Sequence, residues 1–504
     1  MTLLLLLLGF VGAPLPQTAP GLPGGGTPAG GAPAARGDTL PPPVGREAVE
    51  ALTYPPLVFD PPEAEEHEVL GVAVYYLHDP ALPLVDFFVQ LRGGPGHFSR
   101  AVFASTSALP ALLRLGGTRT LPPDSVDLKI DLLALQVSFS SGVGGSLVGL
   151  NALTDTFDDG IALLREMLLE PGLDSAALEV WRGQQLEGIR RREDDPQGLA
   201  YSEFNRLMFG EHPTGWVATV EDFSAERLSR ESLLAAHETL ICRNRIILGL
   251  AGDLSWEEAE PRIREFLVPW PECAEELPEP PVAELRDKPG VFLIRKDVEQ
   301  STVIMAQPGG LLLDDSPEYF ASRIADFILG SGGFTSRMMT RVRTEQGLAY
   351  GASSLWGASR RSQGLLGALT FTRPERTIEA ARLLRDVMDE FRGTPPESDE
   401  VESALEEIAN GYVFAFESAA QIVARRMGYR AQELPDAWLE RYLEGLQEVT
   451  PSAIAEVTGR YLDPSRMTIL ILGEPTRFDP GLEELGPVYE LSPDGSVTPW
   501  DPGF

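Results

Sequence analysis

Residues 332–350, with the sequence Gly-Gly-Phe-Thr-Ser-Arg-Met-Met-Thr-Arg-Val-Arg-Thr-Glu-Gln-Gly-Leu-Ala-Tyr, are the most informative part of this 504-residue chain. The stretch begins with a glycine-rich turn, after which Arg343 and Tyr350 stand seven residues apart. A guanidinium group presents several fixed hydrogen-bond donors and a phenol can donate one more, so this pair can bind peptide carbonyls or an oxyanion. A purely structural role is the alternative, because residues seven apart share one helical face in many proteins.

The segments before this stretch follow a defined order. A strand-like segment at 301–305 precedes a Gln-Pro-Gly-Gly turn at 307–310, and a helical pattern then ends at Leu329. Gly332 and Gly333 come next and can expose backbone N–H groups to a bound chain. A helix C-cap explains these two glycines equally well.

Together these segments resemble the second-domain signature of the insulinase/pitrilysin-like zinc peptidases. In that family, such an Arg and Tyr hold the substrate beside a zinc ion that is bound in the opposite domain. The resemblance covers roughly residues 55–475 and is more specific in the second half than in the first. It implies that Arg343, Tyr350, Gly332 and Gly333 bind substrate.

The zinc motif of that family is missing from the first half. Family members carry H-x-x-E-H on a helix, where two His bind zinc and the Glu activates water. Here the segment 105–118 ends in the Gly-Thr that follows the zinc helix in the family, which places Ala108, Ala111 and Leu112 at the His, Glu and His positions. None of these side chains can ligate zinc or accept a proton. We therefore expect this chain to bind no metal, and the resemblance implies a zinc ion in a partner subunit.

The remaining candidates for metal ligands are few. Segment 179–196 resembles the helix that carries the family's third ligand and places Glu187 or Gly188 at that position, while a surface helix carboxylate is the alternative for Glu187. We interpret His97 and His212 as turn residues. A rebuilt metal site is disfavoured, because the chain has only two Cys and no two of its five His stand three or four residues apart. The histidines are His67, His78, His97, His212 and His237.

The composition limits the classes of partner. A net charge of -34 argues against nucleic acid and anionic membranes, because both require a basic surface to replace counterions. Cationic peptides would be attracted, although a solvated acidic surface that keeps the protein soluble also explains the charge. An apolar content of 43% over this length indicates two or more globular domains.

The N-terminus resembles a secretory signal peptide, which we place at residues 1–13. Its apolar run is too short to span a bilayer, although it lacks a preceding Lys or Arg and Pro14 would follow the cleavage site. We expect export to the periplasm and no stable membrane span after processing. Residues 14–50, rich in Pro, Gly and Ala, form a predicted tether. Cys242 and Cys273 can form one bridge in an oxidising compartment, or stay free thiols.

Two β-rich segments that end in Gly, at 245–252 and 466–473, stand 221 residues apart and indicate an internal duplication. The strand-like segments that begin at Gly71 and Gly290 repeat at nearly the same offset. We therefore predict the α+β class, with two homologous lobes that are each a mostly antiparallel mixed sheet backed by helices, arranged as a half-clamshell. The predicted domains are 51–267 and 289–475, with a Pro-rich acidic linker at 268–288 and a tail at 476–504.

The resemblance implies a non-catalytic, substrate-binding subunit of a heterodimeric insulinase-family metallopeptidase. Arg343 and Tyr350 would hold extended peptides for proteolysis at the zinc of a homologous partner that carries H-x-x-E-H. The chain would be inactive alone. The alternative is a stand-alone peptide-binding or scaffold protein derived from the same fold.

Overall fold

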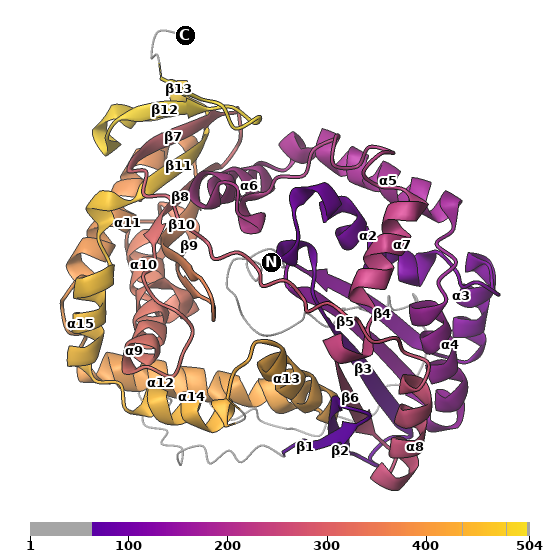
Figure 1. Ribbon diagram of the computed structural model, residues 1–504. Coiled ribbons are helices and arrows are strands. Elements are labelled where there is room, and N and C mark those ends of the chain that lie inside the picture. Colours follow the sequence, from indigo (N-terminus) through magenta and orange to yellow (C-terminus); the bar gives the residue numbers. More distant parts are fainter. Residues whose placement is uncertain (1–62, 436, 480, 501–504) are drawn as a thin grey trace, which may run out of the picture. The chain divides into compact units, whose positions relative to one another are not determined.

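The computed structural model describes residues 63–435, 437–479 and 481–500 (Figure 1). The predicted signal peptide and tether lie outside these ranges. The described residues form two mixed β-sheets backed by helices, so the predicted α+β class is confirmed. We call the first sheet with helices α2 to α8 the first lobe, and the second sheet with helices α9 to α15 the second lobe. In the described ranges, no helix combines the length and apolar character needed to cross a membrane.

The first sheet has the strand order β1-β2-β6-β3-β5-β4. Strands β2 and β6 run parallel, and every other neighbouring pair is antiparallel. Every second residue of β3 from Val85 to Leu91 is buried, the alternation typical of a strand with one face on a core. The strands are β1 (Glu65–Val69), β2 (Val72–His78), β3 (Leu84–Arg92), β4 (Gln136–Gly142), β5 (Gly145–Leu153) and β6 (Ile246–Gly252).

Helices of the first lobe bury apolar side chains against this sheet. Asp174 caps one of them, since its carboxylate accepts the backbone N–H groups of Ala176 and Ala177 at 2.9 Å, as its place before a helical pattern predicts. The helices are α2 (Phe103–Leu115), α3 (Pro123–Leu132), α4 (Phe157–Leu169), α5 (Ser175–Arg190), α6 (Pro196–Phe209), α7 (Arg230–Leu240) and α8 (Trp256–Leu267).

The second sheet has the order β13-β12-β7-β11-β8-β10-β9. Two of its strands, β12 and β13, come from the segment that the sequence indicated as a tail, and β12 pairs in parallel with β7. The strands are β7 (Gly290–Arg295), β8 (Ser301–Pro308), β9 (Ala349–Ala358), β10 (Gln363–Thr372), β11 (Thr468–Gly473), β12 (Val488–Leu491) and β13 (Val497–Pro499).

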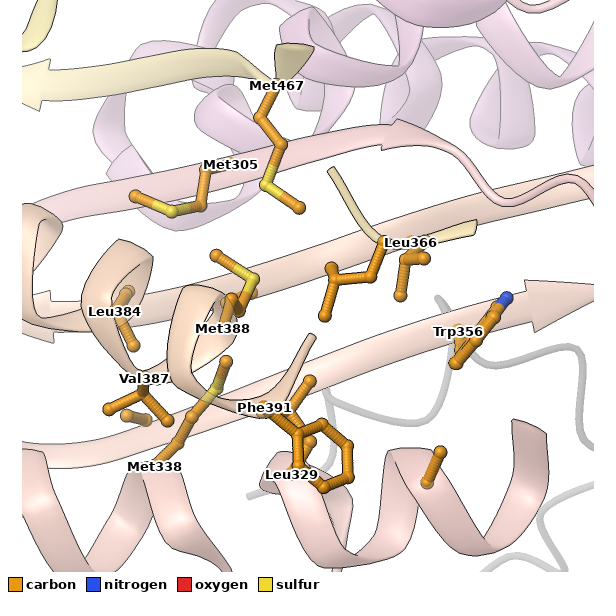
Figure 2. Packing of buried hydrophobic residues seen from close by; sticks show 14 of the residues in the cluster. Met305, Leu329, Met338, Trp356, Leu366, Leu384, Val387, Met388, Phe391 and Met467 are labelled. Carbon is orange, nitrogen blue, oxygen red and sulfur yellow. The ribbon is translucent and has the colours of Figure 1, made fainter. Parts of the chain in front are cut away.

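Figure 2 shows how one face of the second sheet is filled: Met305 and Leu366 on its strands pack near Met388 and Phe391 of α11 and near Met338. The helices are α9 (Pro317–Asp326), α10 (Arg337–Met339), α11 (Thr377–Phe391), α12 (Ser398–Val413), α13 (Ala419–Ala431), α14 (Trp438–Gln447) and α15 (Pro451–Tyr461). Two π-helical segments, Phe327–Ser331 and Thr340–Glu345, lie between α9 and β9.

The two sheets repeat one topology. The order β2-β6-β3-β5-β4 in the first matches β7-β11-β8-β10-β9 in the second, and each begins with a parallel pair followed by antiparallel pairs. Strands β6 and β11 are the two segments whose similarity indicated a duplication. The repeated order therefore supports two homologous lobes.

One helix of each lobe packs on the sheet of the other lobe. Leu199 and Phe204 of α6 share an apolar cluster with Leu470 of β11. In return, Val423 and Met427 of α13 share a cluster with Tyr75 and Ile247 of the first sheet. Figure 1 shows α6 beside β8 and α13 beside β6. The two lobes are thus joined by buried apolar surface as well as by the chain between them.

Gly249 in β6 permits the approach of α13. A Cβ atom at this position would overlap the Sδ atom of Met427 and the Cγ1 atom of Val423. Both neighbours are buried and belong to α13, so neither can move without disturbing the helix. The absence of a side chain is therefore a packing requirement here.

The segment between α8 and β7 has no helix or strand, yet it is fastened at its start. Cys273 forms a disulfide with Cys242, with Cα atoms 5.5 Å apart. Of the two alternatives that the sequence left open, a bridge or free thiols, the structure has the bridge. The backbone N–H of Arg243 donates to Pro271 O at 2.8 Å, and the Nη2 group of Arg245 donates to Glu275 O at 2.7 Å. The first third of the linker therefore lies along the first lobe.

We expect Gly249→Ala to lower the free energy of unfolding by about 1–3 kcal/mol, because the added methyl group overpacks the contact between β6 and α13. Chemical denaturation measures this change. Gly188→Ala on α5 is the matched control, since a Cβ there meets no atom within 4 Å. An unchanged stability of Gly249→Ala would show that α13 does not pack closely on β6.

Candidate substrate-binding site

The Arg343–Tyr350 element begins where α9 ends. The α-helix changes into a π-helical segment at Phe327, a 3-10 turn follows at Gly333–Thr335, and a second π-helical segment ends at Glu345 before β9 begins. π-helical turns are rare and are frequently found at functional sites. The helix up to Leu329 and the glycine-rich turn after it were predicted from the sequence, whereas the two π-helical segments were not.

Arg343 lies between two exposed aromatic rings. Its guanidinium carbon is 4.6 Å from the ring centroid of Phe334 and 4.6 Å from that of Tyr350. The side chain of Phe334 is 70% exposed and that of Tyr350 is 79% exposed, although both are large and apolar enough to be buried elsewhere. Each exposed cation–π contact contributes about 0.5–1 kcal/mol, which fixes the direction of the arginine. The structure thus brings the predicted pair together.

Phe334 is a member of this site that sequence reasoning missed. It stands in the glycine-rich turn, nine residues before Arg343, a distance that no helical periodicity connects. The 3-10 turn Gly333–Thr335, α10 and the π-helical segment Thr340–Glu345 connect the two residues and place the ring over the guanidinium group. An aromatic residue inside a glycine-rich turn was the available signal, because such turns otherwise favour small polar residues.

The neighbouring arginines are paired with carboxylates, and Arg343 is not. Arg337 binds Glu400 through two hydrogen bonds of 2.8 and 2.6 Å, and Arg341 binds Glu390 at 3.1 Å. Among the residues that the structure describes, Arg343 has no ion-pair partner. Its N–H donors are therefore available to a ligand.

The two glycines shape the turn. The backbone N–H of Gly332 donates to Phe327 O at 3.0 Å, and a Cβ at Gly332 would overlap Phe327. Gly333 has φ +68°, a left-handed conformation that glycine adopts without strain. The end of the helix therefore accounts for both positions, and their predicted contact with substrate stays a prediction.

Tyr350 is the second residue of β9, which is an edge strand of the second sheet. Strand β9 pairs with β10 on one side, and no strand among the described residues pairs with its other side, where Trp356 O already accepts a hydrogen bond from Arg323. An edge strand of this kind can bind an extended peptide as one more strand. The Arg343 cluster therefore stands at the entrance to a surface suited to peptide backbone.

The first lobe has an equivalent turn before its edge strand β4, but it lacks the Arg/Tyr pair. Ala134 (φ +52°) stands two residues before β4, as Gly347 (φ +60°) stands two residues before β9. The next residue, Leu135 or Leu348, is buried in each lobe. Counting along the strands then places Val137 where the second lobe has Tyr350. The duplication thus kept the turn in both lobes and the Arg/Tyr pair in one.

The positions that the sequence assigns to the family's zinc ligands lie on α2. Ala108 and Leu112 are fully buried in the apolar core of the first lobe, and Ala111 is half-buried. These side chains supply no donor atom, so the residues present do not fit a zinc ion. Within the described part of the chain, no three His, Cys, Asp or Glu side chains are grouped closely enough to hold a metal.

Glu187, the candidate third ligand, lies near the end of α5. Its carboxylate pairs with Arg191 and, at 3.6 Å, with Arg190. This arrangement is that of a surface helix carboxylate.

His97 and His212 do more than form turns. The Nδ1 group of His97 lies 2.8 Å from Pro278 O, and the Nε2 group of His212 lies 3.0 Å from Pro281 O. His212 also accepts the backbone N–H of Thr214 at 3.2 Å, as expected for a turn residue. Both histidines therefore hold the linker, a long-range contact that no local pattern in the sequence revealed.

Comparisons with known proteins agree with this geometry. Residues 227–408 match the model of the peptidase M16 inactive domain. The chain is 23% identical over 403 residues to the non-peptidase homologue YmxG of Helicobacter pylori, a match that covers 80% of this chain and 91% of the relative. It is 25% identical to an uncharacterised zinc protease of Streptomyces coelicolor, covering 69% of this chain and 75% of that protein.

Solved structures show the same fold. A peptidase M16 inactive domain from Pseudomonas fluorescens matches with a TM-score of 0.71 at 22% identity, covering 82% of this chain and 98% of that one. The periplasmic protease PqqL of Escherichia coli matches with a TM-score of 0.67 at 13% identity, covering 85% of this chain and 49% of PqqL.

The two sheets share one topology, and in the second lobe the half-buried Arg343 lies against the exposed ring of Tyr350. These features, with apolar residues at the positions that the sequence assigns to zinc ligands, are those of a peptidase-like protein. Residues 227–408 match the inactive domain of the M16 peptidases, the insulinase/pitrilysin-like family, and the rest of the comparisons make the chain similar to proteins of that family.

The exposed rings are expected to contribute little to folding. Phe334→Ala and Tyr350→Ala should each change the free energy of unfolding by less than about 1 kcal/mol, as surface substitutions do. Leu348→Ala, in the same block but 5% exposed, should cost about 2–5 kcal/mol. Denaturant titration of the three variants makes the comparison. A cost for Tyr350→Ala equal to that of Leu348→Ala would assign the ring a structural role.

The purified chain is expected to hold zinc only in trace amounts, because Ala108, Ala111 and Leu112 offer no ligand atom. Elemental analysis after dialysis against zinc and then buffer measures the content. About one tightly held zinc per chain would contradict this expectation.

Proposed function

We propose that this chain is the non-catalytic, substrate-binding subunit of a heterodimeric M16 metallopeptidase. It would hold extended peptides for hydrolysis at the zinc of a partner subunit that carries H-x-x-E-H. The observation that carries the proposal is the state of Arg343, which is oriented by two exposed rings and has no carboxylate partner among the described residues. Arg343 is half-buried, and no ion pair among the described residues accounts for its place.

A bound peptide would first meet the free edge of β9. Its backbone would pair with the N–H and C=O groups of that strand, which bind any sequence in an extended conformation. Arg343 would then donate hydrogen bonds to one peptide carbonyl, and the hydroxyl of Tyr350 would donate to the same carbonyl or to its neighbour. Both hydrogen bonds become stronger as negative charge develops on that oxygen.

The partner would be a homologue of this chain, because the M16 resemblance includes families in which one subunit supplies the zinc motif and another the Arg/Tyr element. The name of one relative, a non-peptidase homologue, supports a chain that is inactive alone. The net charge of -34 favours cationic peptides at long range and disfavours nucleic acid.

An exported, periplasmic location belongs to the same proposal. The apolar run at the N-terminus and the disulfide between Cys242 and Cys273 support it, because disulfides persist in oxidising compartments. The similar protein PqqL is described as periplasmic.

A stand-alone peptide-binding or scaffold protein is the second candidate. The edge strand and Arg343 would serve that function equally well, since both can bind a peptide that is not cleaved afterwards. Partner-independent peptide affinity would favour it.

The test uses the complex with an H-x-x-E-H-bearing homologue. Tyr350→Phe and Arg343→Ala should each lower peptide turnover by about 100-fold, because each removes a donor to the reacting carbonyl. Size-exclusion chromatography should show that assembly is unchanged.

Arg341→Ala is the matched control, because Arg341 lies in the same π-helical segment and is occupied by Glu390 and Glu345. Its turnover should stay within about twofold of the wild type, as is typical of surface changes. Full turnover by the Arg343 and Tyr350 variants would remove both residues from the reaction, and turnover by the partner alone would remove this chain.

A further inference from the structure

We propose that residues 277–283 of the linker, here called the strap, occupy a second peptide-binding groove, and that the groove takes an extended acidic peptide when the strap leaves. This inference rests on the proposed function only in that the ligand is a peptide. The proposed groove is separate from Arg343 and Tyr350. The strap has the sequence Leu-Pro-Glu-Pro-Pro-Val-Ala.

The strap lines a pocket of about 760 Å³. The strap is one wall of this open space and side chains of both lobes form the rest, so a peptide in place of the strap would also face free volume beside it. From the first lobe come Gln90, Arg92, His97, Phe209 and His212; from the second come Leu355, Arg360, Arg361 and Gln432.

The contacts to the strap are those expected for a bound peptide. His97 donates to Pro278 O at 2.8 Å and His212 donates to Pro281 O at 3.0 Å. Ala283 donates its backbone N–H to the Oγ atom of Ser362 at 2.9 Å. All three of these contacts involve main-chain groups of the strap, and every extended peptide offers such groups. The groove therefore recognises an extended backbone more than it recognises this particular sequence.

One side-chain contact adds selectivity for charge. The carboxylate of Glu279 pairs with Arg361 at 3.0 Å. Arg361 also pairs with Glu433 at 3.3 Å, and Glu433 pairs with Arg92 at 3.4 Å. Arg360 donates to Leu313 O at 3.1 Å and has no carboxylate partner among the described residues.

The strap supplies a carboxylate that balances the arginines of the pocket. Three arginines and three glutamates line it, and one of the glutamates, Glu279, belongs to the strap. When the strap leaves, three arginines face two glutamates. The emptied groove is therefore positive and complementary to a carboxylate.

The net charge of -34 does not oppose this local preference. Salt at physiological strength screens charges beyond about 8 Å, so the arginines that touch the ligand decide which side chain is bound. A peptide with an acidic residue placed between prolines or other extended residues fits the groove.

The strap can leave while the lobes stay folded. It is fastened on one side by the disulfide at Cys273 and on the other by Arg286, whose backbone N–H donates to Met208 O at 2.8 Å. Between these points it forms no helix or strand, and Val282 is 64% exposed. Leu277 packs on Gly93 and is the apolar anchor of the segment.

The test measures binding of a fluorescent peptide with the sequence of residues 276–283 to the full chain. The strap variant Leu277→Ala/Glu279→Gln should bind it at least about tenfold more tightly than the wild type, because the strap competes for the groove and its occupancy lowers the apparent affinity. Glu276→Gln is the matched control and should change the affinity by less than about twofold, since Glu276 has no ion pair among the described residues.

Two further variants identify the groove. Adding Arg361→Ala to the strap variant should remove the gain, and replacing the peptide's central glutamate by glutamine should weaken binding to the same degree. Hydrogen exchange at Ala283 should be faster in the strap variant, which confirms that the strap is released in a folded chain.

A released strap without a gain in peptide affinity, or a gain that survives Arg361→Ala, would overturn the proposal. Arg343→Ala should leave this affinity unchanged. Failure of peptide turnover in the complex and failure of strap displacement are therefore separate results.

Discussion

The contact between α13 and the first sheet, together with its counterpart between α6 and the second sheet, is the constraint on which the rest of the structure depends. Each sheet completes its core with a helix from the other lobe, so neither lobe buries all of its apolar surface alone. Gly249 shows how close the fit is, because even one methyl group would strike α13. The linker is tied to this exchange after the strap, because the backbone N–H of Arg286 donates to Met208 O on α6.

The two lobes differ in what they do with equivalent surfaces. In the first lobe, the positions that the sequence assigns to a zinc site belong to the apolar core, with Ala108 and Leu112 fully buried on α2. In the second lobe, two exposed aromatic rings flank an arginine without an ion-pair partner among the described residues, and the small cation–π energy there does not offset the cost of exposed apolar surface for solubility. The first lobe thus shows packing where the second shows an accessible surface.

Local patterns predicted much of the fold. Strand β3 and the cap at Asp174 follow from alternation and from N-cap chemistry, both of which act within a few residues. The similarity of β6 and β11 predicted the duplication for the same reason. The π-helical segments were beyond such patterns, because one extra residue per turn leaves no compositional mark. The roles of His97 and His212 depend on contacts with a linker about 70 to 180 residues away in sequence. Strands β12 and β13 are too short to show alternation.

Both sheets end in a strand with a free side, β4 in the first lobe and β9 in the second. Two copies of the chain could pair through such edges and add strands to one another without limit, which is how many β-proteins aggregate. Mutual repulsion between molecules that each carry a charge of -34 opposes that encounter. A short peptide carries too little charge to be repelled in the same way. The acidity of the chain therefore acts as a filter that admits peptides to the edges and keeps whole copies of the protein apart.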